Sequence, residues 1–389
     1  MMPDYDQILA QGIRRGAAPG AVAIIVSRDG VIWEGAAGER VLNSGVPMTT
    51  DTVGAIYSMT KALTAAAAMQ LVEQGRLGLD SPAGDVLPWL QQVQVLEGFD
   101  ASNRPVVRAP IRPITLRHLL THTSGFVYER WNQNDARWRQ AKGTPAMATR
   151  LNRALQVPLA FDPGTRWEYG IGIDWAGKMI EAVSGQLLSD YFAEHLMGPL
   201  GMIDTAYVPT PSMRTRLAGL HRRQPDGSFE PIVQAQPSAP EFETGGGGLH
   251  STMRDYGRFI RMILRDGELD GQRLLQAQTV QTMSTNQIGD LRVSLLRSRI
   301  PEQSNDAEFF PGEPKSWGLS FQINETACHT GRPAGTLMWA GLVNCFFWID
   351  RHNGIGGAYL SQILPFADER SMGLFYELES AAYAARQAR

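Results

Sequence analysis

A serine and a lysine stand three residues apart at Ser58 and Lys61, and these two side chains could do covalent chemistry together. On a helix this spacing places both side chains on one face, one turn from each other. A lysine whose pKa is lowered by burial can take the proton of the serine hydroxyl, which makes the serine a nucleophile. A serine at a helix start is usually a simple N-cap, so this S-x-x-K motif alone leaves both interpretations open.

The element that must position this pair is a helix, which we predict to run from Ala55 to just before Gly75. The sequence between them is rich in Ala and Leu and contains no Gly or Pro, so its helix propensity is high. Few of its residues are charged, as expected of a buried central helix. Free backbone N–H groups and the positive end of the helix dipole would lie beside the serine.

The overall composition is that of an ordinary soluble protein. The chain has 389 residues, of which 43% are hydrophobic and 19% charged, and its net charge is −3. We therefore expect about two domains and neither a nucleic-acid nor a membrane partner. The N-terminus lacks the basic and apolar regions of a secretory signal, so we expect a cytoplasmic location. Cys328 and Cys345 lie in no metal-binding pattern and are predicted to be reduced core residues.

The strand patterns lie at the two ends of the chain. Two β-rich runs, 20–26 and 31–36, flank Asp29-Gly30, which is a strong hairpin signal. Short strand patterns return between residues 317 and 361 and favour an antiparallel sheet. The N-terminal hairpin has no partner nearby in the sequence. We therefore expect it to pair with the C-terminal strands.

The segment 79–238 differs, because it has many prolines and short helical patterns. Residues 115–122 predict a short helix with Thr115 as its cap, and residues 175–197 predict a longer one. We therefore predict an α/β (α+β) fold with an antiparallel sheet flanked by helices. Residues 1–78 and 239–389 would form this α/β domain, with 79–238 as an inserted, mainly helical domain. The stretch around residues 231–248, rich in Pro, Ser and Gly, marks the second boundary.

Further motifs follow the Ser58 pair in a fixed order: Leu119–Gly125, Trp167–Tyr169, Gly246–Thr252 and Trp339–Gly341. This order and spacing resembles the family VIII carboxylesterases, the esterase branch of the class C β-lactamase and penicillin-binding protein superfamily. The resemblance covers about residues 5–380. It implies a beta-lactamase-like fold and a serine hydrolase that works through a covalent acyl-enzyme, without a metal or cofactor.

The resemblance also implies a role for individual residues. Ser58 matches the nucleophile, Lys61 its proton partner, and Tyr169 a general base assisted by the positive charge of the lysine. An ammonium group near a tyrosine hydroxyl favours the phenolate, so this role is physically reasonable. Without the order of the motifs, an aromatic packing residue would be the preferred interpretation of Tyr169. The backbone N–H groups of Ser58 and Leu342 would form the oxyanion hole.

Two departures from the lactamase pattern bear on the substrate. Trp339-Ala340-Gly341 replaces Lys-Thr-Gly, whose lysine helps to hold a substrate carboxylate, so its loss favours neutral esters. Trp339 and Gly341 are then predicted substrate contacts, although Trp339 could also be a core residue of the sheet, and the small Gly341 would let substrate approach the strand. Ile171 stands at the predicted substrate position where lactamases carry Asn. It cannot make amide contacts, which disfavours efficient β-lactam hydrolysis.

Other candidate sites are weaker. His118 and His122 have the i, i+4 spacing of a metal pair on a helix, but no third ligand accompanies them, so structural hydrogen bonding is the preferred interpretation. Residues 90–110 and 285–315 are irregular, and either segment could cover the pocket.

We predict a carboxylic ester hydrolase that acts on short-chain acyl esters, with a small-molecule ester as its partner. The alternatives are an amide hydrolase, such as a β-lactamase or D-peptidase, and a penicillin-binding-like receptor without turnover.

Overall fold

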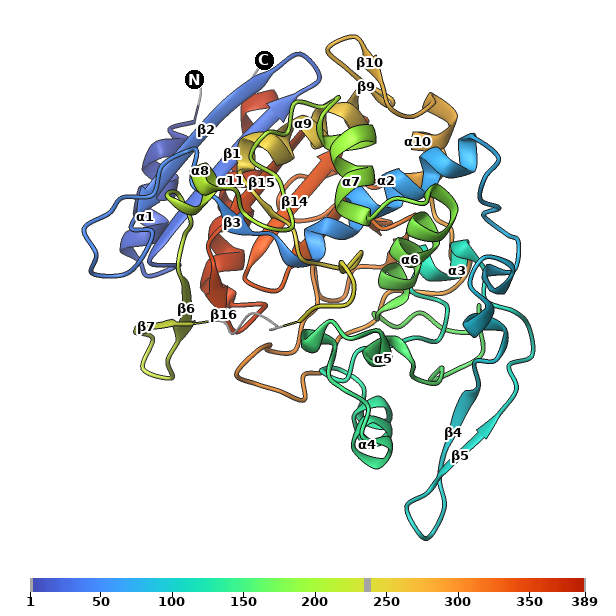
Figure 1. The fold of residues 1–389 in the computed structure, drawn as a ribbon. Coiled ribbons are helices and arrows are strands. Elements are labelled where there is room, and N and C mark those ends of the chain that lie inside the picture. Colours follow the sequence, from blue (N-terminus) through green and yellow to red (C-terminus); the bar gives the residue numbers. More distant parts are fainter. Residues whose placement is uncertain (1–2, 234–238, 388–389) are drawn as a thin grey trace.

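The centre of the molecule is an antiparallel sheet of seven strands, seen in a computed structural model that describes residues 3–233 and 239–387 (Figure 1). Its strands are β1 (Gly20–Ser27), β2 (Val31–Gly38), β11 (Lys315–Trp317), β12 (Gln322–Asn324), β13 (Leu337–Gly341), β14 (Cys345–Asp350) and β15 (Ile355–Leu360). Their order is β11-β12-β13-β14-β15-β1-β2. β1 pairs with β15 in the register Val22↔Leu360. The prediction of one sheet built from both chain ends is confirmed.

Helices cover both faces of the sheet. They include α1 (Tyr5–Arg14), α9 (Met253–Leu264) and α11 (Glu369–Gln387). Successive strand residues point to opposite faces. On β14, Phe346 packs on Phe375 of α11, whereas Phe347 packs on Tyr256 of α9, each with ring centroids 5.1 Å apart. α9 and α11 therefore lie on opposite faces. α1 packs against both β2 and α11, so the first and last helices lie side by side (Figure 1).

The helix that carries the reactive pair begins later than predicted. Ser58 lies in a 3₁₀ turn, Tyr57–Met59, and α2 spans Thr60–Glu73. The φ angle of Tyr57 is +43°, a value that an α-helix cannot contain, so the helix starts only after this turn. α2 is buried from Thr60 to Leu71, which confirms the predicted buried central helix.

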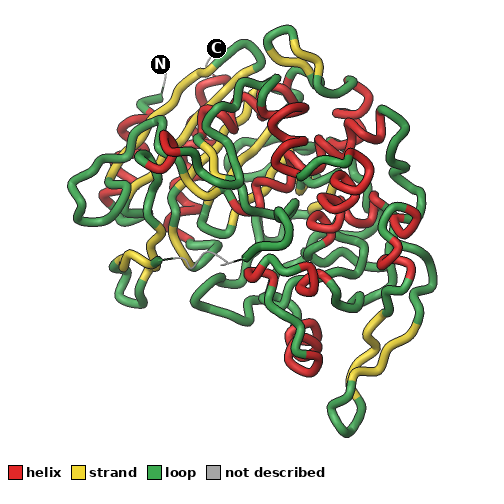
Figure 2. Tube along the Cα trace, viewed as in Figure 1, coloured by secondary structure: helices red, strands yellow, loops and turns green. Residues whose placement is uncertain are grey.

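Residues 79–233 consist of short helices, a few strands and long loops (Figure 2). The α-helices are α3 (Leu116–Leu120), α4 (Gln133–Lys142), α5 (Asn152–Leu155), α6 (Gly172–Ser184), α7 (Leu188–Phe192) and α8 (Pro211–Arg214). The single helix predicted over 175–197 is wrong. Gly185 ends α6 in the left-handed conformation, with φ +75°, and α7 then begins a new helix.

Other short elements connect these parts. They are β3 (Gly54–Ala55), β4 (Val95–Phe99), β5 (Pro105–Arg108), β6 (Leu220–Arg223), β7 (Phe229–Ile232), β8 (His250–Ser251), β9 (Glu268–Leu269), β10 (Gln272–Arg273), α10 (Ala277–Met283) and β16 (Ile363–Leu364). The β4–β5 hairpin projects from the body of the molecule (Figure 1). The boundary predicted between residues 238 and 239 adjoins residues 234–238, which lie outside the described residues, so the division into two domains stays a prediction.

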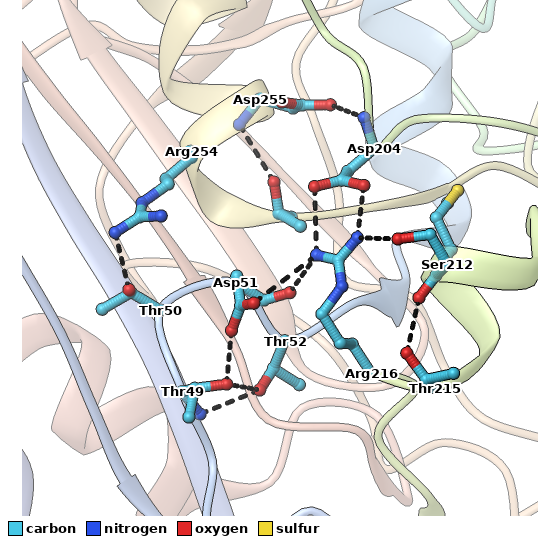
Figure 3. Close-up of polar contacts among 12 residues, drawn as sticks. Thr49, Thr50, Asp51, Thr52, Asp204, Ser212, Thr215, Arg216, Arg254 and Asp255 are labelled. Atoms are coloured by element: carbon cyan, nitrogen blue, oxygen red, sulfur yellow. Dashed lines mark hydrogen bonds and ion pairs between the residues drawn. The ribbon is translucent and has the colours of Figure 1, made fainter.

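An ion-pair cluster holds the segment that precedes the reactive serine (Figure 3). The guanidinium of Arg216 donates to both carboxylate oxygens of Asp204 and, at 2.8 Å, to the backbone oxygen of Asp51. The backbone N–H of Val53 in turn donates to the Arg216 carbonyl at 2.9 Å. These contacts fix the chain a few residues before Ser58.

Both cysteines are buried and unpaired, which confirms that Cys328 and Cys345 are core residues. In the described part of the chain, no helix is both long enough and apolar enough to cross a membrane.

Candidate active site

Ser58 opens into a cavity of about 460 Å³ between β13 and loops within residues 79–233 and 239–250. Its wall includes Ser58, Tyr128, Tyr169, Asp174, Trp339 and Leu342. Of the two irregular segments, residues 285–315 contribute Gln303 to this wall. Residues 90–110 form the projecting hairpin instead, and none of them is among the described residues that line the cavity.

Ser58 and Lys61 are in direct contact. The Nζ atom of Lys61 lies 3.0 Å from Ser58 Oγ. Lys61 is fully buried and also donates to the hydroxyl of Tyr128, at 3.2 Å, and to the backbone carbonyl of Gly246. The preceding Tyr57 is in the left-handed region, where a bulky residue is strained. The backbone therefore turns sharply at the serine, and its hydroxyl faces the lysine.

Asp174 supplies a negative charge near the buried Lys61, and Gly246 forms a hydrogen bond to each of the two side chains. The carbonyl of Gly246 accepts from Lys61, and its amide donates to Asp174 Oδ1 at 2.9 Å. Burial raises the pKa of Asp174, whereas the positive charge of Lys61 and the Gly246 N–H oppose this shift. A Cβ atom on Gly246 would lie 2.6 Å from Asp174 Oδ2, so the close contact needs a glycine.

Tyr169 lies between the lysine and the sheet. Its ring centroid is 4.9 Å from Lys61 Nζ, and its hydroxyl accepts a hydrogen bond from Trp339 Nε1 at 3.2 Å. Both aromatic side chains are buried. Trp339 is thus a core residue of the sheet and also orients the tyrosine hydroxyl.

His122 holds the loop that carries Tyr169. Its carbonyl accepts from Glu168 N at 3.0 Å, its Nδ1 accepts from Gly170 N at 3.4 Å, and its ring packs on Tyr169. Burial and the nearby charge of Lys61 hold the pKa of His122 well below its usual value. The motif around residues 119–125 therefore has a structural role, because its His122 positions the loop that carries Tyr169.

The prediction that His118 and His122 lie on one helix is wrong. α3 ends at Leu120, and His122 has a φ of +58° beyond its end. His118 belongs to the capping box of α3, in which its Nδ1 accepts from the backbone N–H of Thr115. The two rings therefore serve separate hydrogen bonds, and Thr115 is the predicted helix cap.

Three other predicted residues lie near the site in different ways. A Cβ on Gly341 would meet the carbonyl oxygen of Ile56 at 2.3 Å, so this glycine lets β13 approach the backbone beside the nucleophile. Leu342, directly after β13, lines the cavity. Ile171 is fully buried at the start of α6 and does not belong to the described cavity wall, whereas Asp174, about one turn later, does.

Tyr128 and Asp174 are site residues that were not predicted from the sequence, and neither was the link that Gly246 forms between Lys61 and Asp174. Tyr128 contacts Lys61, and burial together with the nearby Asp174 and Tyr169 raises its pKa well above the usual value. A signal for Tyr128 was available, since the aromatic residues Tyr128 and Trp131 lie within six positions of Gly125, where the motif ends.

Comparisons with known proteins agree with this geometry. The family model described as Beta-lactamase matches residues 5–382. The lovastatin esterase of Penicillium rubens is 31% identical over 376 residues, covering 92% of this chain and 93% of that protein. Monacolin J acid methylbutanoyltransferase of Aspergillus terreus is 32% identical over 362 residues, covering 88% and 84%. The unliganded simvastatin synthase LovD from Aspergillus terreus superposes with a TM-score of 0.86 at 29% identity, covering 98% of each chain. The chain belongs to the beta-lactamase family.

Proposed function

We propose that this protein is a serine hydrolase that cleaves carboxylic esters through a covalent acyl-enzyme on Ser58. The observation that carries the proposal is the 3.0 Å contact between Ser58 Oγ and the buried Lys61 Nζ at the wall of a cavity. Relatives named as an esterase and as a methylbutanoyltransferase support it, because both activities move an acyl group between oxygen atoms.

In the first half of the reaction, Ser58 Oγ bonds to the ester carbonyl carbon while its proton moves to the pair formed by Lys61 and Tyr169. The C–O bond to the alcohol then breaks, and the same pair returns the proton to the leaving oxygen. In the second half, water attacks the acyl carbon and gives one proton to the pair. The Ser58–acyl bond breaks, the acid leaves, and Ser58 Oγ recovers its proton.

The developing oxyanion needs donors that are already in place. We assign this role to the backbone N–H groups of Ser58 and Leu342. Neither amide is a donor in the turn and loop hydrogen bonds of the described residues. The close approach of β13 to the backbone of Ile56, which Gly341 allows, supports this assignment, because Ser58 and Leu342 follow these two segments and both line the cavity.

Short-chain acyl esters are the proposed substrates, with acyl transfer to an alcohol as a second reaction of the same acyl-enzyme. The name of the monacolin relative favours this second reaction. Amide or β-lactam hydrolysis is disfavoured, because the buried Ile171 supplies no amide group to a substrate.

The test is hydrolysis of p-nitrophenyl acetate, butyrate and octanoate by the wild type, Ser58→Ala and the control Ser44→Ala, which changes an exposed serine. We expect the shorter esters to react faster and Ser58→Ala to lose at least about a thousandfold in kcat. Full activity in Ser58→Ala would place the nucleophile elsewhere. Faster turnover of nitrocefin than of every ester would favour a β-lactamase. Release of one equivalent of p-nitrophenol per enzyme, without steady turnover, would favour a penicillin-binding-like receptor.

A further inference from the structure

Three arginines line the active-site cavity: Arg130, Arg150 and Arg222. They come from the loop after Tyr128, from the residue after the 3₁₀ turn Met147–Thr149, and from β6. None of the three forms an ion pair within residues 3–233 and 239–387. The wall of one cavity therefore includes three arginines.

Several other arginines of the chain form an ion pair with a carboxylate. Arg216, for example, is bound on two sides by the Asp204 carboxylate (Figure 3), and the buried Arg332 pairs with Glu379. The segment 234–238, which lies outside the described residues, has the sequence Gln-Ala-Gln-Pro-Ser and contains no carboxylate. It therefore offers the cavity arginines no counter-charge.

The acidic groups nearest in sequence or register are engaged elsewhere. Glu129 is 3.6 Å from the guanidinium of Arg139. Glu230 lies opposite Arg222 in the β6–β7 register, but its carboxylate accepts from Gln224 Nε2 at 2.8 Å. Asp174, the acid in the cavity wall, already faces the charge of Lys61.

The guanidinium groups keep donors available. The Nε of Arg130 donates to Gln303 Oε1 at 2.8 Å, and its Cζ lies 5.3 Å from the ring centroid of Trp131, so two contacts fix the side chain. Among the described residues, no hydrogen bond is formed by its two terminal nitrogens. Burial lowers the pKa of Arg130, against the partly opposing negative charge of the neighbouring Glu129. The Nε of Arg222 is buried without a hydrogen-bond partner among the described residues. Buried polar groups without partners are uncommon in proteins.

We propose that the substrate is an ester that carries a carboxylate, which Arg130, Arg150 and Arg222 bind in the active-site cavity. A guanidinium can donate two parallel hydrogen bonds to a carboxylate, and a cleft lined by one sign of charge concentrates ligands of the other sign. The loss of lysine at Trp339 suggested neutral esters, but these arginines supply positive charge from other walls of the same cavity. This inference rests on the proposed esterase function.

The first test compares matched ester pairs that differ only in charge. In one pair the acyl part varies: the mono-4-nitrophenyl ester of adipic acid and the same ester with a terminal primary amide. In the other pair the alcohol part varies: 3-acetoxybenzoate and 3-acetoxybenzamide. We expect kcat/KM to be at least about tenfold higher for the anionic member of one pair at low salt, and the ratio to fall as salt screens the charges. The pair that shows the effect tells which side of the ester carries the carboxylate.

The second test changes the arginines. Arg130→Gln, Arg150→Gln and Arg222→Gln should each reduce the ratio of anionic to neutral kcat/KM by about tenfold. Arg153→Gln removes the same charge from an exposed arginine outside the cavity wall and should leave the ratio unchanged. An equal or higher rate for the neutral member of both pairs would overturn the proposal, as would variants that keep the wild-type ratio.

A binding measurement separates this proposal from the esterase function. If no ester is hydrolysed in a Ser58-dependent way, the proposed function fails. Calorimetric titration of Ser58→Ala with 3-acetoxybenzoate and 3-acetoxybenzamide then still decides whether the cavity selects an anion. Tighter binding of the anion that is lost in Arg222→Gln would support the arginine site, and equal binding of the two compounds would refute it.

Discussion

At the scale of single residues, Lys61 organises the site. A lysine ammonium has three N–H donors. Here they are directed at Ser58 Oγ, the Tyr128 hydroxyl and the Gly246 carbonyl. Because each acceptor comes from a different part of the chain, the ammonium has one orientation, and the serine hydroxyl is held with it. Asp174 completes the arrangement from the other side of Gly246.

Two tyrosines flank this lysine, and a pair of variants separates their roles. Tyr169→Phe removes the hydroxyl that Trp339 orients, and we expect kcat to fall by about a hundredfold, as for the loss of a general base. Tyr128→Phe removes one acceptor of the ammonium and should cost about tenfold. Pre-steady-state hydrolysis of p-nitrophenyl butyrate measures both. A larger loss in Tyr128→Phe than in Tyr169→Phe would assign the base to Tyr128.

At the scale of elements, the loop with Tyr169 is held by tight backbone packing. A Cβ on Gly170 would lie 2.0 Å from the carbonyl oxygen of Phe126, so Gly170→Ala must displace the loop. We expect a loss of about 1–3 kcal/mol in the free energy of unfolding and a lower kcat.

Gly373→Ala is the matched control for this substitution. Gly373 lies inside α11, and its added methyl group would meet nothing within 4 Å. This variant should gain about 0.5–1 kcal/mol, because alanine is the better helix former. Urea unfolding of both variants measures the two effects. Equal stability of Gly170→Ala and wild type would show that the loop accommodates the methyl group without strain.

The first turn of α9 contains a carboxylate whose ionisation opposes folding (Figure 3). Burial raises the pKa of Asp255 to about 6, against the partly opposing hydrogen bonds from Thr205 and Asp204 N. The folded state therefore holds the proton more tightly than the unfolded chain. The contribution of Asp255 to the free energy of unfolding is therefore largest below about pH 4, and it is lost as the pH rises through about 6.

Asp255→Asn removes this dependence and keeps an oxygen acceptor. The variant should gain stability relative to wild type between about pH 4 and pH 6, by at most about 3 kcal/mol, and the difference should stay constant above pH 7. Urea unfolding of both proteins at pH 4, 5, 6 and 7 measures this difference. Parallel stability curves for the two proteins would contradict the raised pKa.

What the sequence could predict follows from the range of the interactions. The Asp29-Gly30 turn and the Ser58-Lys61 spacing are local patterns, so the hairpin and the reactive pair were accessible. The partners of Lys61 were not, because Tyr128 and Gly246 are 67 and 185 residues away and meet it only in the folded chain. The helix start at Thr60 was missed for a related reason, since a positive φ at a tyrosine depends on tertiary packing.

At the scale of the whole molecule, the two chain ends close one sheet, and the last helix secures the closure. α11 packs on α1 and covers β14, while the cavity lies at the side where β13 meets loops within residues 79–233 and 239–250. The site therefore depends on contacts between segments from the start, middle and end of the chain. A substitution that loosens the packing of α11 should therefore lower the esterase rate as well as the free energy of unfolding.

The ion pair between Arg332 and Glu379 tests this dependence. Arg332 precedes β13 and Glu379 lies in α11, and both side chains are completely buried. Arg332→Leu would leave a carboxylate without its counter-charge in the interior, at a cost of about 3–5 kcal/mol. The double variant Arg332→Leu/Glu379→Leu removes both charges and should recover most of this loss. Urea unfolding and the esterase rate, measured on the same samples, should fall and recover together. A double variant as unstable as Arg332→Leu would show that α11 is held by the shape of these side chains rather than by the balance of their charges.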